Sequence, residues 1–287
     1  MLGIDEHLPD LIDVLSLKAS SISRIEPIAA SIPWMYDDLI KLVNLPQYRR
    51  TDKKGKVVAI ESLRMGLNFL GIDNLRLVVP SLAFRRWIPQ ITDPFPEIKS
   101  RVWEQAIGTA ISCKRIAQVM KLDDATAFTL GMFQQIGFLV IVRLYFRLFE
   151  QVHRDAIIEA HNDKKREEYT ALAKIQPSAD FLLSLIDKYA LSLSSQIINK
   201  MDMRRVFIGN SIDEYAKKIP FKDMSPLTRV LYQGNAYCKY RMLKSCKLIN
   251  MDESKEFLRR YQMPPGALSV LKTTDLRHMN LSFEQEM

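Results

Sequence analysis

The stretch from Leu130 to Val142 constrains the fold most, because it is the most apolar part of the chain and yet contains two adjacent amides, Gln134 and Gln135. A helix turns by about 100° per residue. Gln134 therefore falls on the same stripe as Phe138 and Ile141, and we predict that it points inward. A buried amide without a partner costs about 1–3 kcal/mol, so we expect a metal, a ligand or another amide to meet it.

Helical periodicity extends over most of the chain, and alternation of the β type is rare. Leu, Met, Ala, Lys and Glu, which favour helices, are plentiful. We therefore predict an all-α fold. Helices are predicted over 8–19, 23–31, 34–43, 60–69, 74–84, 97–120, 166–173, 178–189, 192–201, 205–218, 227–248 and 253–262.

Three prolines in the segment 88–97 mark the best internal boundary of the chain. We predict a two-lobed helical protein with an N-terminal helical lobe over residues 1–90 and a helical bundle over residues 97–215. Residues 216–287 are predicted to be a helical extension that packs on the bundle. The length of 287 residues suits one large or two small domains.

The predicted long helix 97–120 carries a stripe of small side chains. Ala106, Ala110, Cys113 and Ala117 lie within about 60° of one another around the helix axis. Such a stripe lets a second helix approach closely, and Gln105 borders it.

The net charge of +8 is scattered in short basic pairs, which are typical of solvated helix faces. Nucleic acid is therefore not expected as a partner. One basic segment stands out: the loop 46–57 contains Arg49, Arg50, Lys53 and Lys54 around a central glycine. We predict that this loop is exposed and mobile, and that it contacts an acidic partner.

Three cysteines, an odd and sparse count, indicate free thiols in a reducing compartment. The N-terminus has acids where a signal peptide would have basic residues. The longest apolar run, from Phe138 to Val142, is far too short to cross a bilayer. We expect a cytoplasmic protein without a membrane span.

No catalytic constellation is visible in the sequence. His153 and His161 are separated by about 80° on a helix, which is poor for shared metal binding. Glycine patterns typical of a nucleophile elbow, a phosphate loop or a dinucleotide site do not occur.

A resemblance to a known family rests on the order of several segments. Segments 39–44 (LIKLVN), 59–63 (AIESL) and 69–76 (FLGIDNLR) resemble the first half of the HDOD family. There, a helix ending in Leu-x-x-x-Asn-Ser precedes a second ending in Leu-Gly and then Leu-Arg. Segments 102–106 (VWEQA) and 127–137 resemble its second half, which is similar to the HD phosphohydrolase bundle. The resemblance covers roughly residues 8–215 and implies an HD-like helical bundle.

The departures from the HD pattern fall at its metal ligands. In HD hydrolases, Trp-x-His supplies one ligand and Gly-Leu-Leu-His-Asp-x-Gly supplies a His-Asp pair. The matching positions here are Gln105, Gln134 and Gln135, and the late histidines of some members are absent near 204–215. Neutral amides are weak ligands for a catalytic cation. The resemblance therefore implies vestigial metal-site positions, with no catalytic residue, metal or cofactor.

Two buried amides, Gln105 and Gln134, are expected to bond to each other directly or through one water, with a small polar ligand as the alternative. The resemblance implies a non-catalytic module of signal transduction or regulation that acts through protein interaction, with another signalling protein as its partner. The alternative is a metal-dependent HD-type phosphohydrolase acting on a nucleotide or phosphoester. The oligomeric state is not indicated by the sequence.

Overall fold

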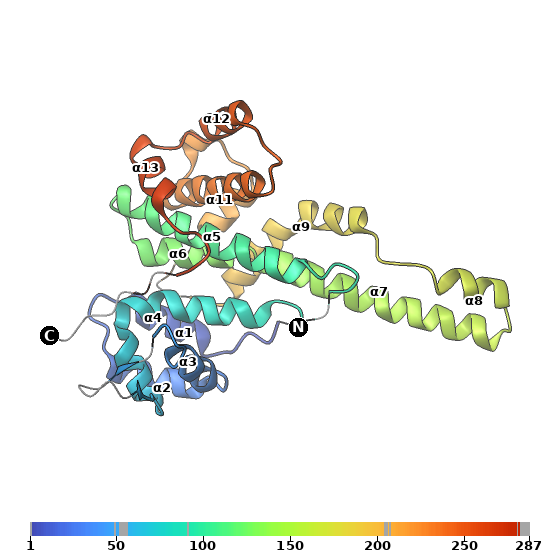
Figure 1. Ribbon diagram of the computed structural model, residues 1–287, viewed down its shortest axis with the longest axis horizontal. Coiled ribbons are helices and arrows are strands. Elements are labelled where there is room, and N and C mark those ends of the chain that lie inside the picture. The colour runs from blue at the N-terminus through green and yellow to red at the C-terminus, as the bar shows by residue number, and fades with distance from the viewer. Residues whose placement is uncertain are drawn as a thin grey trace.

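A computed structural model describes residues 2–48, 50–51, 57–90, 92–203, 206, 208–279 and 281. The protein is all-α, with one pair of two-residue antiparallel strands, and the predicted fold class is confirmed (Figure 1). The elements are α1 (Leu8–Ser16), α2 (Ile22–Ser31), α3 (Met35–Val43), β1 (Arg50–Thr51), β2 (Val57–Val58), α4 (Leu63–Trp87), α5 (Ile98–Val119), α6 (Asp124–Phe133), α7 (Ile136–Asn162), α8 (Arg166–Leu172), α9 (Ala179–Lys200), α10 (Ile208–Ala216), the 3₁₀ turn η1 (Phe221–Asp223), α11 (Pro226–Ser245), α12 (Met251–Arg260) and α13 (Pro265–Thr273).

Helix α5 is central to the packing. It lies against α6 and α11, and α13 covers it further along (Figure 1). Helices α1, α2 and α3 pack on α4, which in turn contacts α6, while α9 packs on α7 and α10. One apolar core runs through these layers, from Leu2 to Leu276. The proposed boundaries at residues 90, 97 and 215 stay predictions.

Helix α4 is interrupted at Gly71, between the predicted helices 60–69 and 74–84. Gly71 has φ 69° and ψ 166°, a conformation open to glycine and strained for other residues. A Cβ added there would meet no atom within 4 Å, so the requirement for glycine comes from the backbone alone. The break lets the two halves of α4 follow different directions.

Replacing Gly71 with alanine should lower the free energy of unfolding by about 1–3 kcal/mol, because the new residue must occupy a strained backbone region. Gly266→Ala is the matched control, since its added Cβ would meet Val119 at an ordinary 3.6 Å. That variant should be unchanged or more stable by up to about 1 kcal/mol. Urea unfolding measures both, and equal effects would contradict the role of the break.

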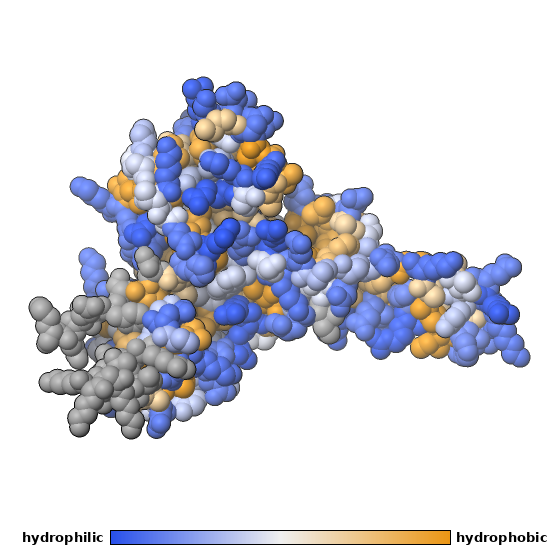
Figure 2. Space-filling model, in the orientation of Figure 1, coloured by the Kyte–Doolittle hydropathy of each residue, from blue (hydrophilic) through white to orange (hydrophobic). Residues whose placement is uncertain are grey.

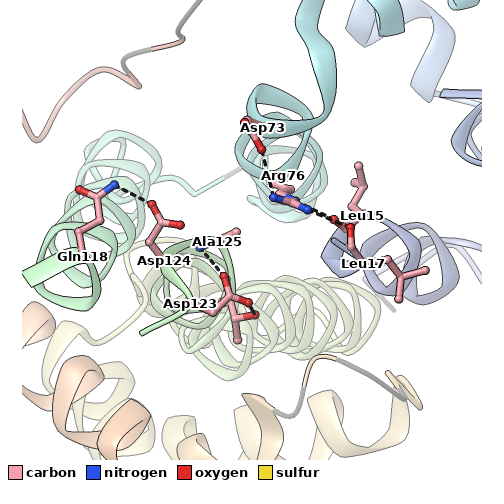
Figure 3. Close-up of polar contacts among 9 residues, drawn as sticks. Leu15, Leu17, Asp73, Arg76, Gln118, Asp123, Asp124 and Ala125 are labelled. Atoms are coloured by element: carbon pink, nitrogen blue, oxygen red, sulfur yellow. Dashed lines mark hydrogen bonds and ion pairs between the residues drawn. The ribbon is translucent and has the colours of Figure 1, made fainter. Parts of the chain in front are cut away.

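Arg76 fixes α4 to the end of α1 (Figure 3). Its Nε donates to the carbonyl of Leu15 at 2.7 Å, and one Nη donates to the carbonyl of Leu17 at 3.0 Å. The other Nη donates to Asp73 at 3.1 Å. A guanidinium in this place satisfies carbonyls that a helix C-terminus leaves free and complements the helix dipole there.

The side chain of Asn44 likewise fixes a backbone segment by hydrogen bonds, at the base of the short hairpin. Its Nδ2 donates to the carbonyl of Ile60 at 2.8 Å, and its Oδ1 accepts from the Ile60 N–H at 3.0 Å. The strands pair Arg50 with Val58 and Thr51 with Val57. The predicted loop 46–57 therefore contains strand residues, Arg50–Thr51 and Val57, and its exposure and mobility stay predictions.

The predicted partner-contact residues of this segment are largely beyond what the structure describes. Arg49, Lys53 and Lys54 lie outside the described residues, and only the backbone of Arg50 is described. Their contact with an acidic partner stays a prediction.

The predicted pair of helices 178–189 and 192–201 was also wrong, because the structure has one helix, α9, over Ala179–Lys200. Within α9, Ser194 lies 2.9 Å from the carbonyl of Ala190, four residues earlier. A serine whose hydroxyl lies near the carbonyl four residues earlier is tolerated inside a helix.

Two helical stretches are long and apolar enough to cross a membrane by length and composition alone. The first, Asp124–Asn162, has its most apolar part 83% buried within the protein, as expected of a core helix. The second, Ala179–Lys200, is only 22% buried over the corresponding part. This low burial reflects a projecting part of the fold.

The projecting part consists of residues 143–190, which we call the arm. It contains the distal part of α7, all of α8 and the first half of α9, and it extends far from the other helices (Figure 1). The imidazole of His153 bonds to the carbonyl of Leu172 at 2.7 Å, and the Tyr145 hydroxyl donates to the carbonyl of Ser178 at 2.9 Å. These bonds fix the segment between α8 and α9 along α7.

Candidate functional site

The predicted vestigial residues Gln134 and Gln135 lie at a joint between two helices. Helix α6 ends at Phe133, and α7 begins at Ile136. Gln134 is 3% exposed and Gln135 is 6% exposed, so the predicted burial of Gln134 is confirmed. The single continuous helix that led to this prediction was wrong.

Ser194 of α9 clamps this joint. Its hydroxyl donates to the carbonyl of Gln134 at 2.7 Å and accepts from the N–H of Gly137 at 2.9 Å. These two backbone groups lie where the helical ladder is interrupted, and the serine supplies partners for both. Sequence reasoning missed Ser194, because a serine inside an amphipathic helix carries no sign of a contact sixty residues away.

Glycines allow the neighbouring helices to reach the joint. A Cβ on Gly137 would lie 2.0 Å from the carbonyl oxygen of Ala190, so only glycine lets α9 lie this close. A Cβ on Gly131 would lie 2.7 Å from the Cα of Ala110. The small-residue stripe of α5 therefore forms the predicted close helix contact, with α6 at Ala110 and with α11 at Cys113.

The amides themselves have unmet hydrogen-bonding capacity. The Gln134 Nε2 and the Gln135 Oε1 are buried without a hydrogen-bond partner. Gln105 is only half-buried, and no hydrogen bond joins its side chain to Gln134 among the described residues. The direct amide–amide bond is therefore not formed, and the pair bridged by one water and the small polar ligand stay predictions.

The chemistry of the joint does not suit a metal centre. Gln105, Gln134 and Gln135 offer amide groups, which carry no charge to offset that of a divalent cation. Across the part of the chain that the structure describes, no group of three or more His, Cys, Asp and Glu could hold a metal ion. The donor set that the HD pattern requires is thus not assembled by these residues.

The buried thiols of Cys113 in α5 and Cys238 in α11 are poor nucleophiles. All three cysteines are free, as the sequence indicated. Burial raises the pKa of the Cys113 thiol, and burial raises the pKa of Cys238 to about 11. A thiol becomes reactive as a thiolate, so these two residues serve packing: Cys113 lies against Gly234, and Cys238 against Gly108.

Removing the clamp should destabilise the protein. Ser194→Ala leaves the Gln134 carbonyl and the Gly137 N–H buried without this partner, and the free energy of unfolding should fall by about 1–3 kcal/mol. Ser184→Ala, which removes an exposed hydroxyl from the same helix, should change it by no more than about 0.5 kcal/mol. Equal stability of the two variants in urea unfolding would show that the joint does not depend on Ser194.

The buried, unpaired amide nitrogen of Gln134 leads to a second prediction. Gln134→Met keeps a similar volume and removes the buried Nε2, so its stability should equal or exceed that of the wild type. Gln196→Met, on the exposed side of α9, is the control and should stay within about 0.5 kcal/mol of the wild type. A loss of more than about 1 kcal/mol for Gln134→Met alone would mean that the amide has a partner, such as a bridging water.

Comparison with solved structures shows the general fold. The chain is similar to a Shewanella amazonensis SB2B protein provisionally named as a phosphohydrolase, with a TM-score of 0.59 and 15% identity over 96% of this chain and 92% of that one. A response regulator, MmoQ from Methylococcus capsulatus strain Bath, gives a TM-score of 0.39 at 13% identity, over 94% of this chain and 97% of that one. No curated protein matches the sequence.

The family assignment comes from the sequence itself. The HDOD domain matches residues 4–183, which is more than half of the chain. This range includes Asn44, Arg76 and the Gln134–Gln135 joint, so the features described above belong to the matched domain. The protein is a member of the HDOD family.

Proposed function

We propose that the protein is a non-catalytic regulatory module of signal transduction that acts by binding another signalling protein. The observation that carries the proposal is the set of vestigial positions, Gln105 of α5 with Gln134 and Gln135 of the joint, which have neutral amides where HD hydrolases have histidine and aspartate. Hydrolysis by an HD enzyme requires ligands that hold a cation and lower the pKa of its bound water. Three amides cannot replace that set.

Membership in the HDOD family supports a regulatory role, because the family resembles a phosphohydrolase in fold and lacks its ligand pattern. We further propose a two-lobed arrangement, with an N-terminal helical lobe and a C-terminal HD-like bundle, and a cytoplasmic location. The alternative activity, metal-dependent hydrolysis of a nucleotide or phosphoester, requires ligands from other residues. Within the described ranges, no suitable cluster supplies them.

Metal analysis and an activity assay test this proposal together. The purified protein, equilibrated with Mn²⁺ and freed of excess, should contain no stoichiometric metal, and it should not hydrolyse bis(p-nitrophenyl) phosphate above the protein-free rate. Gln134→Ala is the control for the joint and should behave like the wild type. Stoichiometric manganese with hydrolysis in the wild type, both lost in Gln134→Ala, would overturn the proposal.

The regulatory role has its own test. Affinity capture on the wild-type protein from extract of the native cell, followed by mass spectrometry, should enrich another signalling protein, and the purified pair should bind directly. Capture of metabolic enzymes or nucleic acid in its place would contradict a signalling role.

A further inference from the structure

The arm has an open apolar groove along one side. The groove has a volume of about 750 Å³ and is lined by side chains from α7, α8 and α9. Its walls include Leu148, Val152 and Phe181, whose side chains are largely exposed. Figure 2 shows apolar side chains gathered along the arm among the charged ones. The groove is therefore hydrophobic surface that the protein does not cover itself.

The density of exposed apolar residues on the arm is unusual for a monomer. Of the sixteen large apolar side chains exposed among the described residues, eight lie within residues 143–190, about a sixth of the chain. Scattered exposed apolar residues are normal, but a continuous apolar surface marks an interaction site.

Helix α8 shows that the arm is incompletely packed. It has seven residues and none of them is buried. A helix this short is marginal in water unless tertiary packing stabilises it. In the single chain, the apolar cluster at the base of the arm contains three buried residues, Ile141, Val142 and Leu182, of which Leu182 alone belongs to the arm. A partner in the groove would supply the missing contacts.

The charge of the arm identifies the kind of partner. Residues 143–190 contain eight basic and eight acidic side chains, so the arm is neutral although the whole chain carries +8. Charges of both signs occur on α7, at the tip and on α9. Acidic proteins and anionic membranes attract amphipathic surfaces that have an excess of Lys and Arg. The arm has no such excess and does not attract them. It does suit a second copy of itself, since two neutral, mixed surfaces meet without net repulsion.

The size of the arm is sufficient for such pairing. The part of α7 from Arg143 to Asn162 is about 30 Å long at 1.5 Å per residue. Two helices side by side are about 20 Å wide, so each copy offers about 600 Å² and the pair about 1,200 Å², at the lower end of stable interfaces. A two-fold axis would let each arm cover the groove of the other with the same residues.

We propose that the arm is a homodimerisation element, in which the groove of each copy receives the apolar face of the arm of a second copy. The proposal is independent of the non-catalytic role. The dimer is held mainly by apolar contact, so it should persist in concentrated salt, where attraction between exposed charges is screened.

Analytical ultracentrifugation of the full-length protein tests the proposal. The wild type should be a dimer at micromolar concentration. Val152→Glu should weaken the dimer at least about tenfold, because it places an unpaired charge in the buried centre of the interface. The monomer should keep its fold, since this side chain is 66% exposed in the single chain. Circular dichroism and thermal unfolding verify that.

A matched control comes from the same helix. Ile158→Glu changes a side chain that is 49% exposed and does not line the groove, and it should leave the dimer intact. A monomeric wild type, or equal weakening by the Val152 and Ile158 substitutions, would overturn the proposal. Flotation with zwitterionic and anionic phospholipid vesicles tests whether the groove binds a lipid surface. Binding by the wild type that Val152→Glu abolishes would assign the groove to membranes instead.

Discussion

The backbone contact between α5 and α6 is the constraint on which the rest of the structure depends. Gly131 brings α6 so close to Ala110 that a Cβ in its place would clash with the backbone of α5. One turn further along the same stripe of α5, Gly234 brings α11 against Cys113. These contacts fix α5 between the two helices. Helix α4 packs on α6, and α1, α2 and α3 pack on α4.

This central contact was predictable from sequence, and the joint beside it was not. Ala106, Ala110, Cys113 and Ala117 are small and recur at helical spacing, so a close approach to the helix that carries them could be read from residue size and phase. The inward direction of Gln134 was correct, but it was deduced from a helix that the structure ends at Phe133. That ending depends on Ser194, whose position relative to Gln134 follows from the tertiary fold.

The arm shows a second limit of sequence periodicity. Leu148 and Val152 recur along α7 with the spacing of a buried stripe, and the sequence cannot tell whether a folded core covers that stripe. The same spacing predicted a helix near 166–173, which exists as α8 and buries no residue. Helix α8 thus forms without burying a residue. Contacts on one of its sides, together with the segment that follows it, hold it in place.

The clamp at the joint has a consequence for how the protein responds to its surroundings. An HD hydrolase holds this place with histidine, aspartate and a cation, groups whose charge depends on acidity and on the supply of metal. Here a hydroxyl, a peptide carbonyl and a peptide N–H hold Gln134 and Gly137 to α9. None of these groups ionises between about pH 5 and pH 8. The two hydrogen bonds that hold the joint to α9 therefore do not change with acidity over this range.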